Sequence, residues 1–256
     1  MKSFLLTVCL IYLGICLALF VLQRKILYFP VPALISGALP MNVEEISFET
    51  DGQILRGWLV NKGSAKALVY YGGNAENIEQ NIEFFKSINT DYTIYLIPYR
   101  GYGNSSGTPS EKKLYQDALY IFDRLNKQHL SLSLMGRSLG TGVATYVAAQ
   151  RKVEHLILVT PFDSIENAAK NIYWMFPVWL LIRDKYDSLE RASLITADDI
   201  LILIAEQDEV IPLTRTLNFV KQLGNRKFES LVIKEAGHND ISFYPEFSLS
   251  IQSRLK

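Results

Sequence analysis

The sequence predicts an α/β domain with an eight-stranded, mostly parallel sheet and helices on both faces, preceded by one transmembrane helix. Short apolar segments alternate with segments of helical periodicity along most of the chain, a pattern typical of parallel strands joined by helices. The pair Asp51-Gly52 separates the first two strand-like segments, which indicates an antiparallel hairpin at the start of the sheet. An uncharged apolar stretch at the N-terminus is long enough to cross a bilayer.

The N-terminal stretch runs from Phe4 to Leu22 without a charged residue. A transmembrane helix needs about 20 apolar residues, whereas the apolar part of a signal peptide has roughly 7–15 and precedes a small-x-small cleavage site. No such site follows, so we expect an uncleaved anchor over 1–26 and a folded domain over 27–256. A cleaved signal and a buried helix are the alternatives. The charges of Lys2 on one side and of Arg24 and Lys25 on the other nearly balance, so the membrane orientation stays open.

The elements of the domain follow in order after an irregular, proline-containing connection over 27–41. The hairpin strands are expected over 44–50 and 53–60. Further strands are predicted by short apolar runs at 66–72, 92–99, 130–136, 155–162, 199–208 and 227–238. Helical spacing predicts helices at 76–88, 111–126, 139–150, 213–223 and 241–255, and an aromatic, mostly helical segment at 164–194.

The composition excludes several classes of partner and site. Lys+Arg and Asp+Glu are both 26 and no charge run occurs, so nucleic acid is not an expected partner. Both cysteines, Cys9 and Cys16, lie in the N-terminal apolar stretch, which excludes a Cys/His zinc site in the domain. We expect no metal and no cofactor.

A serine lies between two glycines at the end of the predicted strand over 130–136. Gly136-Arg137-Ser138-Leu139-Gly140 matches G-x-S-x-G, and a helix is predicted to begin directly after the serine. This strand-to-helix context is the one that a nucleophile elbow requires, because glycines relieve crowding in the strained turn. Ser138 is therefore the candidate nucleophile, at the carboxyl edge of the sheet where ligands bind in open α/β folds.

A serine nucleophile needs a base, and the chain has three histidines. His129 and His155 precede or begin strands, which puts them at the opposite edge of the sheet from Ser138. His238 follows the last predicted strand and therefore lies at the same edge as the serine. We interpret His238 as the base and the other two histidines as structural.

The base needs a carboxylate to orient it, and in this class of fold the chain order is serine, acid, histidine. Asp208 ends the predicted strand over 199–208 at the carboxyl edge, and Asp163, one strand earlier, is the alternative. Four other aspartates in this part of the chain are expected to be solvated or to cap helices: Asp184, Asp187, Asp198 and Asp199.

Hydrolysis at a carbonyl also needs N–H donors for the oxyanion. One is expected to be the backbone N–H of Leu139, directly after the serine. The other is expected from the loop Gly72-Gly73-Asn74-Ala75, with Asn74 preferred and Gly73 as the alternative.

The chain resembles the α/β-hydrolase superfamily, and more narrowly its N-terminally membrane-anchored branch of serine hydrolases, which includes protein depalmitoylases. Six segments carry the resemblance in the order found there: "YYGGNAEN", "PYRGYGNSSGTPSE", "GRSLGTGVA", "TPFDSI", "AEQDEVIP" and "EAGHND". It covers the chain from about Leu27 to the end. It implies the α/β-hydrolase fold, a Ser138–Asp208–His238 triad and an oxyanion hole at Asn74 and Leu139. The branch usually has a histidine where this chain has Gly72, so we expect a less rigid oxyanion loop with its backbone donors intact.

Two other segments are open to a functional interpretation. The glycine-rich segment "PYRGYGNSSGTPSE" lacks both nucleotide-binding glycine patterns, so Ser105 and Ser106 are interpreted as structural. The aromatic segment 164–194, called the cap segment below, either packs as a cap or offers an acyl-binding or lipid-facing surface. In the second case an apolar pocket is expected at Trp174, Phe176 and Trp179.

The sequence thus predicts a membrane-anchored serine hydrolase that cleaves an acyl ester or thioester through an acyl-enzyme. Its expected substrate is an acyl ester or acyl thioester of a lipid or an acylated protein. The alternative is a catalytically silent scaffold of the same fold that binds a lipid or protein partner at the membrane.

Overall fold

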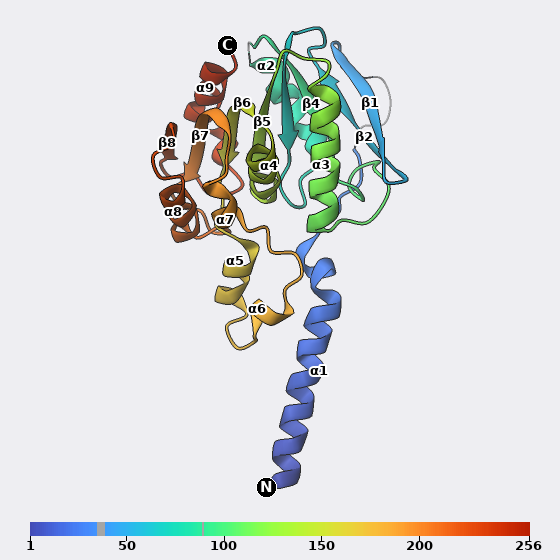
Figure 1. Ribbon diagram of the computed structural model, residues 1–256, viewed down its shortest axis with the longest axis vertical. Coiled ribbons are helices and arrows are strands. Elements are labelled where there is room, and N and C mark those ends of the chain that lie inside the picture. The colour runs from blue at the N-terminus through green and yellow to red at the C-terminus, as the bar shows by residue number, and fades with distance from the viewer. Residues whose placement is uncertain (35–38, 89) are drawn as a thin grey trace.

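The computed structural model describes residues 1–34, 39–88 and 90–256. Within them the chain forms a central sheet of eight strands, with spatial order β1-β2-β4-β3-β5-β6-β7-β8 (Figure 1). β2 pairs antiparallel with β1 and β4, and the other neighbours pair in parallel. The strands are β1 (Val43–Thr50), β2 (Gln53–Val60), β3 (Lys66–Tyr71), β4 (Tyr92–Leu96), β5 (Ser131–Arg137), β6 (Val153–Val159), β7 (Ala197–Ala205) and β8 (Phe228–Ile233). The predicted fold class is confirmed.

The opening hairpin forms at the predicted Asp-Gly turn. Thr50 pairs with Gln53, and the two residues between them have positive φ angles of 53° at Asp51 and 68° at Gly52. Positive φ at both turn residues is the type I′ geometry that matches the twist of a β-hairpin.

Helices cover both faces of the sheet. α3 (Glu111–Leu125), α4 (Leu139–Gln150) and α8 (Leu213–Gln222) pack with one face in one buried cluster, which includes Leu114, Val143 and Phe219. α2 (Asn81–Ser87) and α9 (Pro245–Arg254) pack with the other face through side chains such as Phe85 and Phe247. Neighbouring residues of a strand enter opposite clusters, as the alternation of side chains in a strand requires.

Two predicted helices are shorter than expected. Over 76–88 a 3-10 turn, η1 (Ile78–Gln80), precedes α2, and the side chain of Asn77 accepts the N–H of Glu79 at its start. Over 241–255 the turn η2 (Ile241–Phe243) precedes α9, which begins at Pro245. Proline has no N–H to donate to the preceding turn, so it starts a new helix there.

The cap segment contains three short helices: α5 (Ile165–Ile172), α6 (Val178–Leu181) and α7 (Ser188–Ala192). Ser164 and Asp187 cap α5 and α7 by accepting N–H groups three residues later. The non-helical stretch between α5 and α6 includes Pro177, so the segment is less helical than predicted. In Figure 1 α5 and α6 lie beside the upper part of the N-terminal helix.

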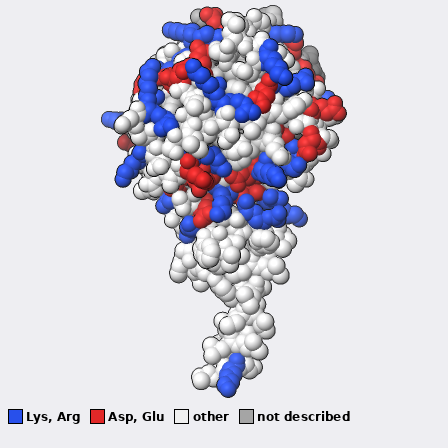
Figure 2. Space-filling model, in the orientation of Figure 1, with Lys and Arg blue, Asp and Glu red and all other residues white. Residues whose placement is uncertain are grey.

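The N-terminal helix α1 (Lys2–Leu27) has 26 residues and projects from the domain as a stalk (Figure 1). At 1.5 Å per residue it is ~39 Å long, more than the ~30 Å of a bilayer core. Its mean hydropathy over 18 residues reaches 2.8, and only 6% of that window is buried. This helix is thus long and apolar enough to cross a membrane. Figure 2 shows charged side chains over the domain down to the top of the stalk, and an uncharged surface below them over most of the stalk.

The connection after α1 is irregular where the structure describes it, as expected; residues 35–38 of it lie outside the described residues. Its first part is bound along the domain. The carbonyl of Val31 accepts the N–H of Gly103, and the carbonyl of Pro32 accepts from Nδ2 of Asn77. The C-terminal end of α1, called its base below, is therefore held close to the glycine-rich loops that follow β3 and β4.

Candidate active site

Ser138 occupies a sharp turn between β5 and α4. Its φ is 50° and its ψ is −117°, a conformation that costs energy for a residue with a side chain. A Cβ at Gly136 would lie 2.4 Å from the carbonyl oxygen of Gly140, and a Cβ at Gly140 would lie 2.0 Å from that of Tyr71. Only glycine fits at both positions, which is the physical reason for the G-x-S-x-G pattern.

The predicted base and acid lie beside this serine. Nε2 of His238 lies 3.0 Å from Oγ of Ser138. Nδ1 of the same ring lies 2.8 Å and 3.0 Å from the two carboxylate oxygens of Asp208. Three residues that are 100 and 30 positions apart in the chain thus form one continuous series of hydrogen bonds.

The carboxylate of Asp208 is held by its own loop. Its Oδ1 accepts the backbone N–H groups of Val210 at 2.9 Å and Ile211 at 2.6 Å. The Asp208 side chain is 4% exposed and that of His238 is 7% exposed, so their interaction is largely shielded from water. A buried carboxylate in this position favours the tautomer with the proton on Nδ1, which leaves Nε2 free to accept the serine proton.

The alternative acid, Asp163, has other partners. Its carboxylate accepts hydrogen bonds from Arg215 at 3.0 Å, Asn218 at 3.2 Å, Asn167 at 3.3 Å and the N–H of Ser164 at 2.7 Å. Asp163 is fully buried, and none of these partners is His238. The geometry therefore favours Asp208 for the acid.

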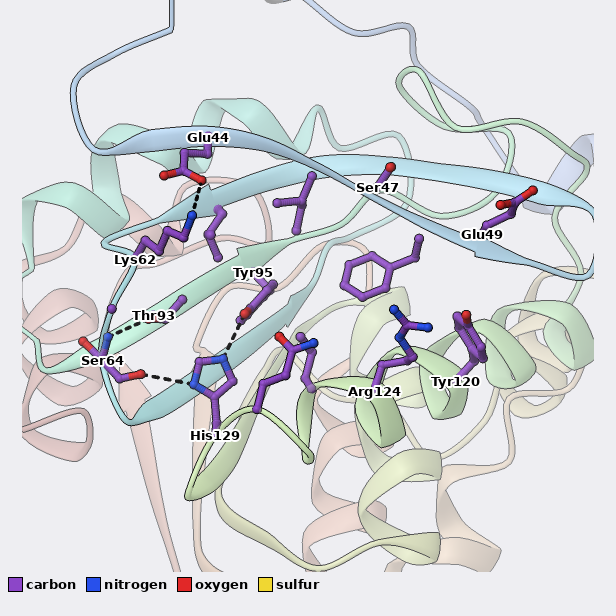
Figure 3. Close-up of a pocket in the computed structure, with 16 residues that line it drawn as sticks. Glu44, Ser47, Glu49, Lys62, Ser64, Thr93, Tyr95, Tyr120, Arg124 and His129 are labelled. Atoms are coloured by element: carbon purple, nitrogen blue, oxygen red, sulfur yellow. Dashed lines mark hydrogen bonds and ion pairs between the residues drawn. The ribbon is translucent and has the colours of Figure 1, made fainter.

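His129 and His155 lie at the opposite edge of the sheet. Figure 3 shows His129 in a hollow of about 890 Å³ beneath the β1–β2 hairpin, between Oη of Tyr95 at 2.9 Å and the carbonyl of Ser64 at 3.1 Å. His155 lies between Glu154 and Asp199, at 3.8 Å and 3.7 Å. Burial lowers the pKa of His155. The residues that line the hollow around His129 do not reproduce the geometry at Ser138.

The loop after β3 lies directly against the serine. A Cβ built at Gly73 would be 3.6 Å from the Cβ of Ser138. The N–H of Gly73 donates to Glu76 at 2.6 Å, so this alternative oxyanion donor is already engaged. The next residue, Asn74, is held in place by its own side chain. Its Nδ2 donates to the carbonyl of Leu27 at 2.6 Å, and its Oδ1 accepts from the hydroxyl of Tyr102 at 2.7 Å.

Leu139, the second expected donor, is the first residue of α4. The N–H groups of the first helical turn have no partner within the helix, so this one is free of the helix ladder. Leu139 thus follows Ser138 directly at the start of α4, and Asn74 belongs to the loop whose Gly73 lies against the serine.

Sequence reasoning missed two charged residues at the site. Glu76 accepts from Gly73, from the hydroxyl of Tyr70 at 2.6 Å and from the amide of Asn81 at 2.6 Å. Arg137 donates to the backbone carbonyl of His238 at 3.3 Å and lies 3.9 Å from Glu76. In the sequence, only their positions pointed to the site: Glu76 lies three residues after Gly73, and Arg137 lies directly before Ser138.

The two serines of the glycine-rich segment after β4 have a structural role. Oγ of Ser105 accepts the N–H of Arg56, and Oγ of Ser106 accepts the N–H of Ile54, so both serines attach the loop to β2. Arg100 forms two hydrogen bonds with the buried carboxylate of Asp117 on α3. Among the residues that the structure describes, no group of three His, Cys, Asp or Glu side chains is placed to hold a metal ion.

An apolar cavity of about 320 Å³ lies between α1 and the cap segment. Phe176 lines it, as expected. Trp174 and Trp179 do not line it; their side chains are 77% and 64% exposed, which corrects the expectation that all three aromatics form one pocket. Trp174 lies in the non-helical stretch that leads to Pro177, and Trp179 lies in α6 directly after it.

Comparison with known proteins assigns the family. The family model for the alpha/beta hydrolase fold matches residues 66–181. An uncharacterized protein of Mycobacterium tuberculosis is 30% identical over 91% of this chain and 86% of its own. The lysophosphatidylserine lipase ABHD12 of Bos taurus is 33% identical over 57% of this chain, which spans 42% of that relative. The structure of the Pyrococcus furiosus esterase Pf2001 has a TM-score of 0.66 at 17% identity, over 89% of this chain and 96% of the esterase.

These likenesses agree with the strand order, the elbow geometry and the arrangement of the sheet. The chain therefore belongs to the α/β-hydrolase superfamily, and it is a hydrolase of the esterase type.

Proposed function

We propose that this protein is a membrane-anchored serine hydrolase that cleaves an acyl ester or thioester through Ser138, His238 and Asp208. The observation that carries the proposal is the hydrogen-bonded series from Ser138 through His238 to Asp208, with the serine on a strained elbow. Such strain persists where it serves reactivity, because a relaxed turn would cost the protein less.

In the proposed reaction, Oγ of Ser138 attacks the acyl carbonyl carbon while Nε2 of His238 takes the hydroxyl proton. The Asp208 carboxylate stabilises the imidazolium that forms and remains ionised. The tetrahedral intermediate then collapses: its bond to the leaving oxygen or sulfur breaks, and His238 returns the proton to that group. Water enters, His238 removes its proton, and a second collapse releases the carboxylic acid and restores Ser138.

The oxyanion of each intermediate is assigned to the N–H groups of Asn74 and Leu139. Preorganised donors of this kind are worth roughly 10²–10³ in kcat each. The hydrogen bonds of the Asn74 side chain to Leu27 and Tyr102 support this assignment, because they fix the peptide that carries the donor. Gly73 is not proposed as a donor, since its N–H is bound to Glu76.

Glu76 and Arg137 are proposed as positioning residues. Glu76 holds the loop after β3 through Gly73, and Arg137 holds the loop that carries His238 through its backbone carbonyl. Gly72 stands where the anchored branch usually has a histidine, and the network around Glu76 supplies rigidity to the same loop. The two side chains approach to 3.9 Å, so both halves of the site share one polar support.

The proposed substrate is an acyl ester or thioester presented at a membrane. The apolar α1, the uncharged surface over most of it and the apolar cavity support a substrate with an aliphatic chain. The name of the bovine relative, a lysophosphatidylserine lipase, supports an ester within a lipid. Residues 1–26 are proposed as the anchor and residues 27–256 as the hydrolase domain.

Covalent labelling with an alkyl fluorophosphonate tests the proposal. Wild-type protein in detergent is expected to label, and the variants Ser138→Ala and His238→Ala are expected not to. Ser248→Ala, at a half-buried serine on α9, and His129→Ala serve as matched controls that keep labelling. Folded wild-type protein that does not label would contradict the enzymatic proposal and favour a silent scaffold that binds a lipid or protein partner.

A further inference from the structure

We propose that α1 forms one wall of the acyl-chain site, so that the aliphatic chain of the substrate lies between α1 and the cap segment. The helix would then be part of the substrate site as well as an anchor. The inference rests on the proposed function, because it assigns a place to the acyl group that Ser138 would receive.

The cavity has two walls from distant parts of the chain. α1 contributes Leu19, Gln23, Ile26 and Leu27. The opposite wall comes from α5, α6 and the turn between them, with side chains such as Ala169 and Phe176. A volume of about 320 Å³ lies at the lower end of the range for ligand pockets, which is roughly 300–1,000 Å³.

One end of the cavity is lined by residues that hydrogen-bond to Asn74 and to Asp208. Leu27 lines the cavity, and its carbonyl accepts from the side chain of Asn74, next to the proposed oxyanion donor. Val210 and Ile211 also line it, and their N–H groups hold the Asp208 carboxylate. The cavity is therefore continuous with the supports of both the oxyanion loop and the acid.

Polar contacts fix α1 against the cap segment. Gln23 donates to the carbonyl of Leu181 at 3.0 Å and accepts the N–H of Arg183 at 2.7 Å. Nearer the N-terminus of the helix, Tyr12 stacks on Phe176 with ring centroids 5.6 Å apart. These contacts tie the helix to the cap at two levels, so the cavity between them has a defined width.

The base of α1 is held by a buried ion pair. Arg24 donates two hydrogen bonds to Asp184, at 2.8 Å and 3.0 Å, and Asp184 is only 2% exposed. The hydroxyl of Tyr28 also contacts Asp184, at 3.2 Å. The expectation that Asp184 is solvated or capping is thus wrong. A buried carboxylate is costly unless paired, so α1 is coupled to the domain more tightly than a simple tether requires.

The chemistry of the lining selects an aliphatic chain as the occupant. Apart from the hydroxyl of Tyr173, its polar side chains are those of Gln23 and Asp184, which already bind the carbonyl of Leu181 and the guanidinium of Arg24. Outside the cavity, four large apolar residues of α6 and of the turn before it are exposed: Trp174, Met175, Trp179 and Leu180. They lie beside the stalk, where a bilayer would meet the domain, so an acyl chain would enter from the lipid without crossing water.

The test is to fill the cavity from the side of α1. In full-length protein in detergent micelles, Leu19→Trp is expected to lower kcat/KM for p-nitrophenyl palmitate by at least about tenfold, because excluding even one methylene from an apolar pocket costs roughly 10–200-fold. Turnover of p-nitrophenyl acetate is expected to stay within about twofold of wild type, since a two-carbon acyl group does not need the cavity. Leu17→Trp, at a residue that is 62% exposed on the same helix, is the matched control.

Ala169→Phe fills the same cavity from the cap segment and is expected to have the same selective effect. Unchanged palmitate turnover in both variants, or an equal loss on both esters, would overturn the inference. These results differ from a failure of the proposed function, in which wild-type protein would show neither fluorophosphonate labelling nor acetate hydrolysis.

Discussion

Two histidines of this protein hold a hydroxyl group at almost the same distance, at opposite edges of the sheet. Nε2 of His238 lies 3.0 Å from Ser138, and Nε2 of His129 lies 2.9 Å from the hydroxyl of Tyr95. The difference is at the second ring nitrogen. Nδ1 of His238 faces the Asp208 carboxylate at 2.8 Å, whereas Nδ1 of His129 faces the backbone carbonyl of Ser64 at 3.1 Å. A carboxylate stabilises an imidazolium far more than a neutral carbonyl does.

The two hydroxyl groups differ as well. Ser138 lies on a turn with a φ of 50°, at the start of a helix that offers N–H donors. Tyr95 lies within β4, and burial raises its pKa, so its proton is harder to remove. A hydrogen bond between histidine and hydroxyl is therefore common to a structural and a candidate catalytic pair. The carboxylate, the strained turn and the oxyanion donors are what separate them.

The largest expected effect comes from removing the hydroxyl of Ser138, and removal of the Tyr95 hydroxyl is the comparison. Ser138→Ala is expected to lower kcat on a soluble ester by about 10⁴–10⁶, because the nucleophile is lost. Tyr95→Phe removes the hydroxyl partner of His129 and is expected to leave kcat within about twofold, while urea unfolding shows a loss of ~1 kcal/mol for the hydrogen bond. Comparable activity in wild type and Ser138→Ala would refute the assignment of the nucleophile.

The next effect separates the two candidate acids. Asp208→Asn is expected to lower kcat by about 10⁴, because the amide favours the wrong tautomer of His238. Asp163→Asn leaves Arg215 without its carboxylate and is expected to lower the free energy of unfolding by ~1–3 kcal/mol, with kcat of the folded protein close to wild type. Steady-state kinetics and urea titration of both variants distinguish the roles, and an inversion of the two results would make Asp163 the acid.

A smaller effect is expected at the support of the oxyanion loop. Glu76→Ala removes the acceptor of the Gly73 N–H and is expected to lower kcat by about 10–10², less than the loss of a donor itself, with KM nearly unchanged. Glu76→Gln keeps an acceptor oxygen and is expected to recover part of the rate. Glu83→Gln, at a carboxylate that is 72% exposed, is the matched control. A rise in KM at constant kcat would contradict the positioning role.

The parts of the site that sequence patterns predicted are those set locally or by the fold. Gly136 is required by contacts under 3 Å within the turn, and Gly140 by contacts under 3 Å with Tyr71 and Gly72 at the end of β3, so the motif reflects both the elbow and the neighbouring strand. The edge on which Asp208 and His238 lie follows from the direction of parallel strands. The buried ion pair at the base of α1 joins instead Arg24 and Asp184, which are 160 positions apart, and no local pattern pairs them. Trp174 and Trp179 were misplaced for the same reason, since only the folded turn sets which side chains face α1.

The smallest effect concerns the third histidine and the pH dependence of stability. Burial lowers the pKa of His155 in the folded protein below its value of about 6.5 in the unfolded chain. Between these two values the unfolded chain binds more protons, so stability is fully present above the unfolded pKa and falls as the pH drops through that window. His155→Gln removes the titrating group and is expected to reduce the fall in Tm between pH 7.5 and pH 5.5, measured against His129→Gln. The nearby carboxylates of Glu154 and Asp199 raise the pKa of His155 and so oppose the effect of burial, which makes the expected change in Tm small but of this sign. A steeper fall in Tm for His155→Gln than for the control would show that the carboxylates outweigh burial.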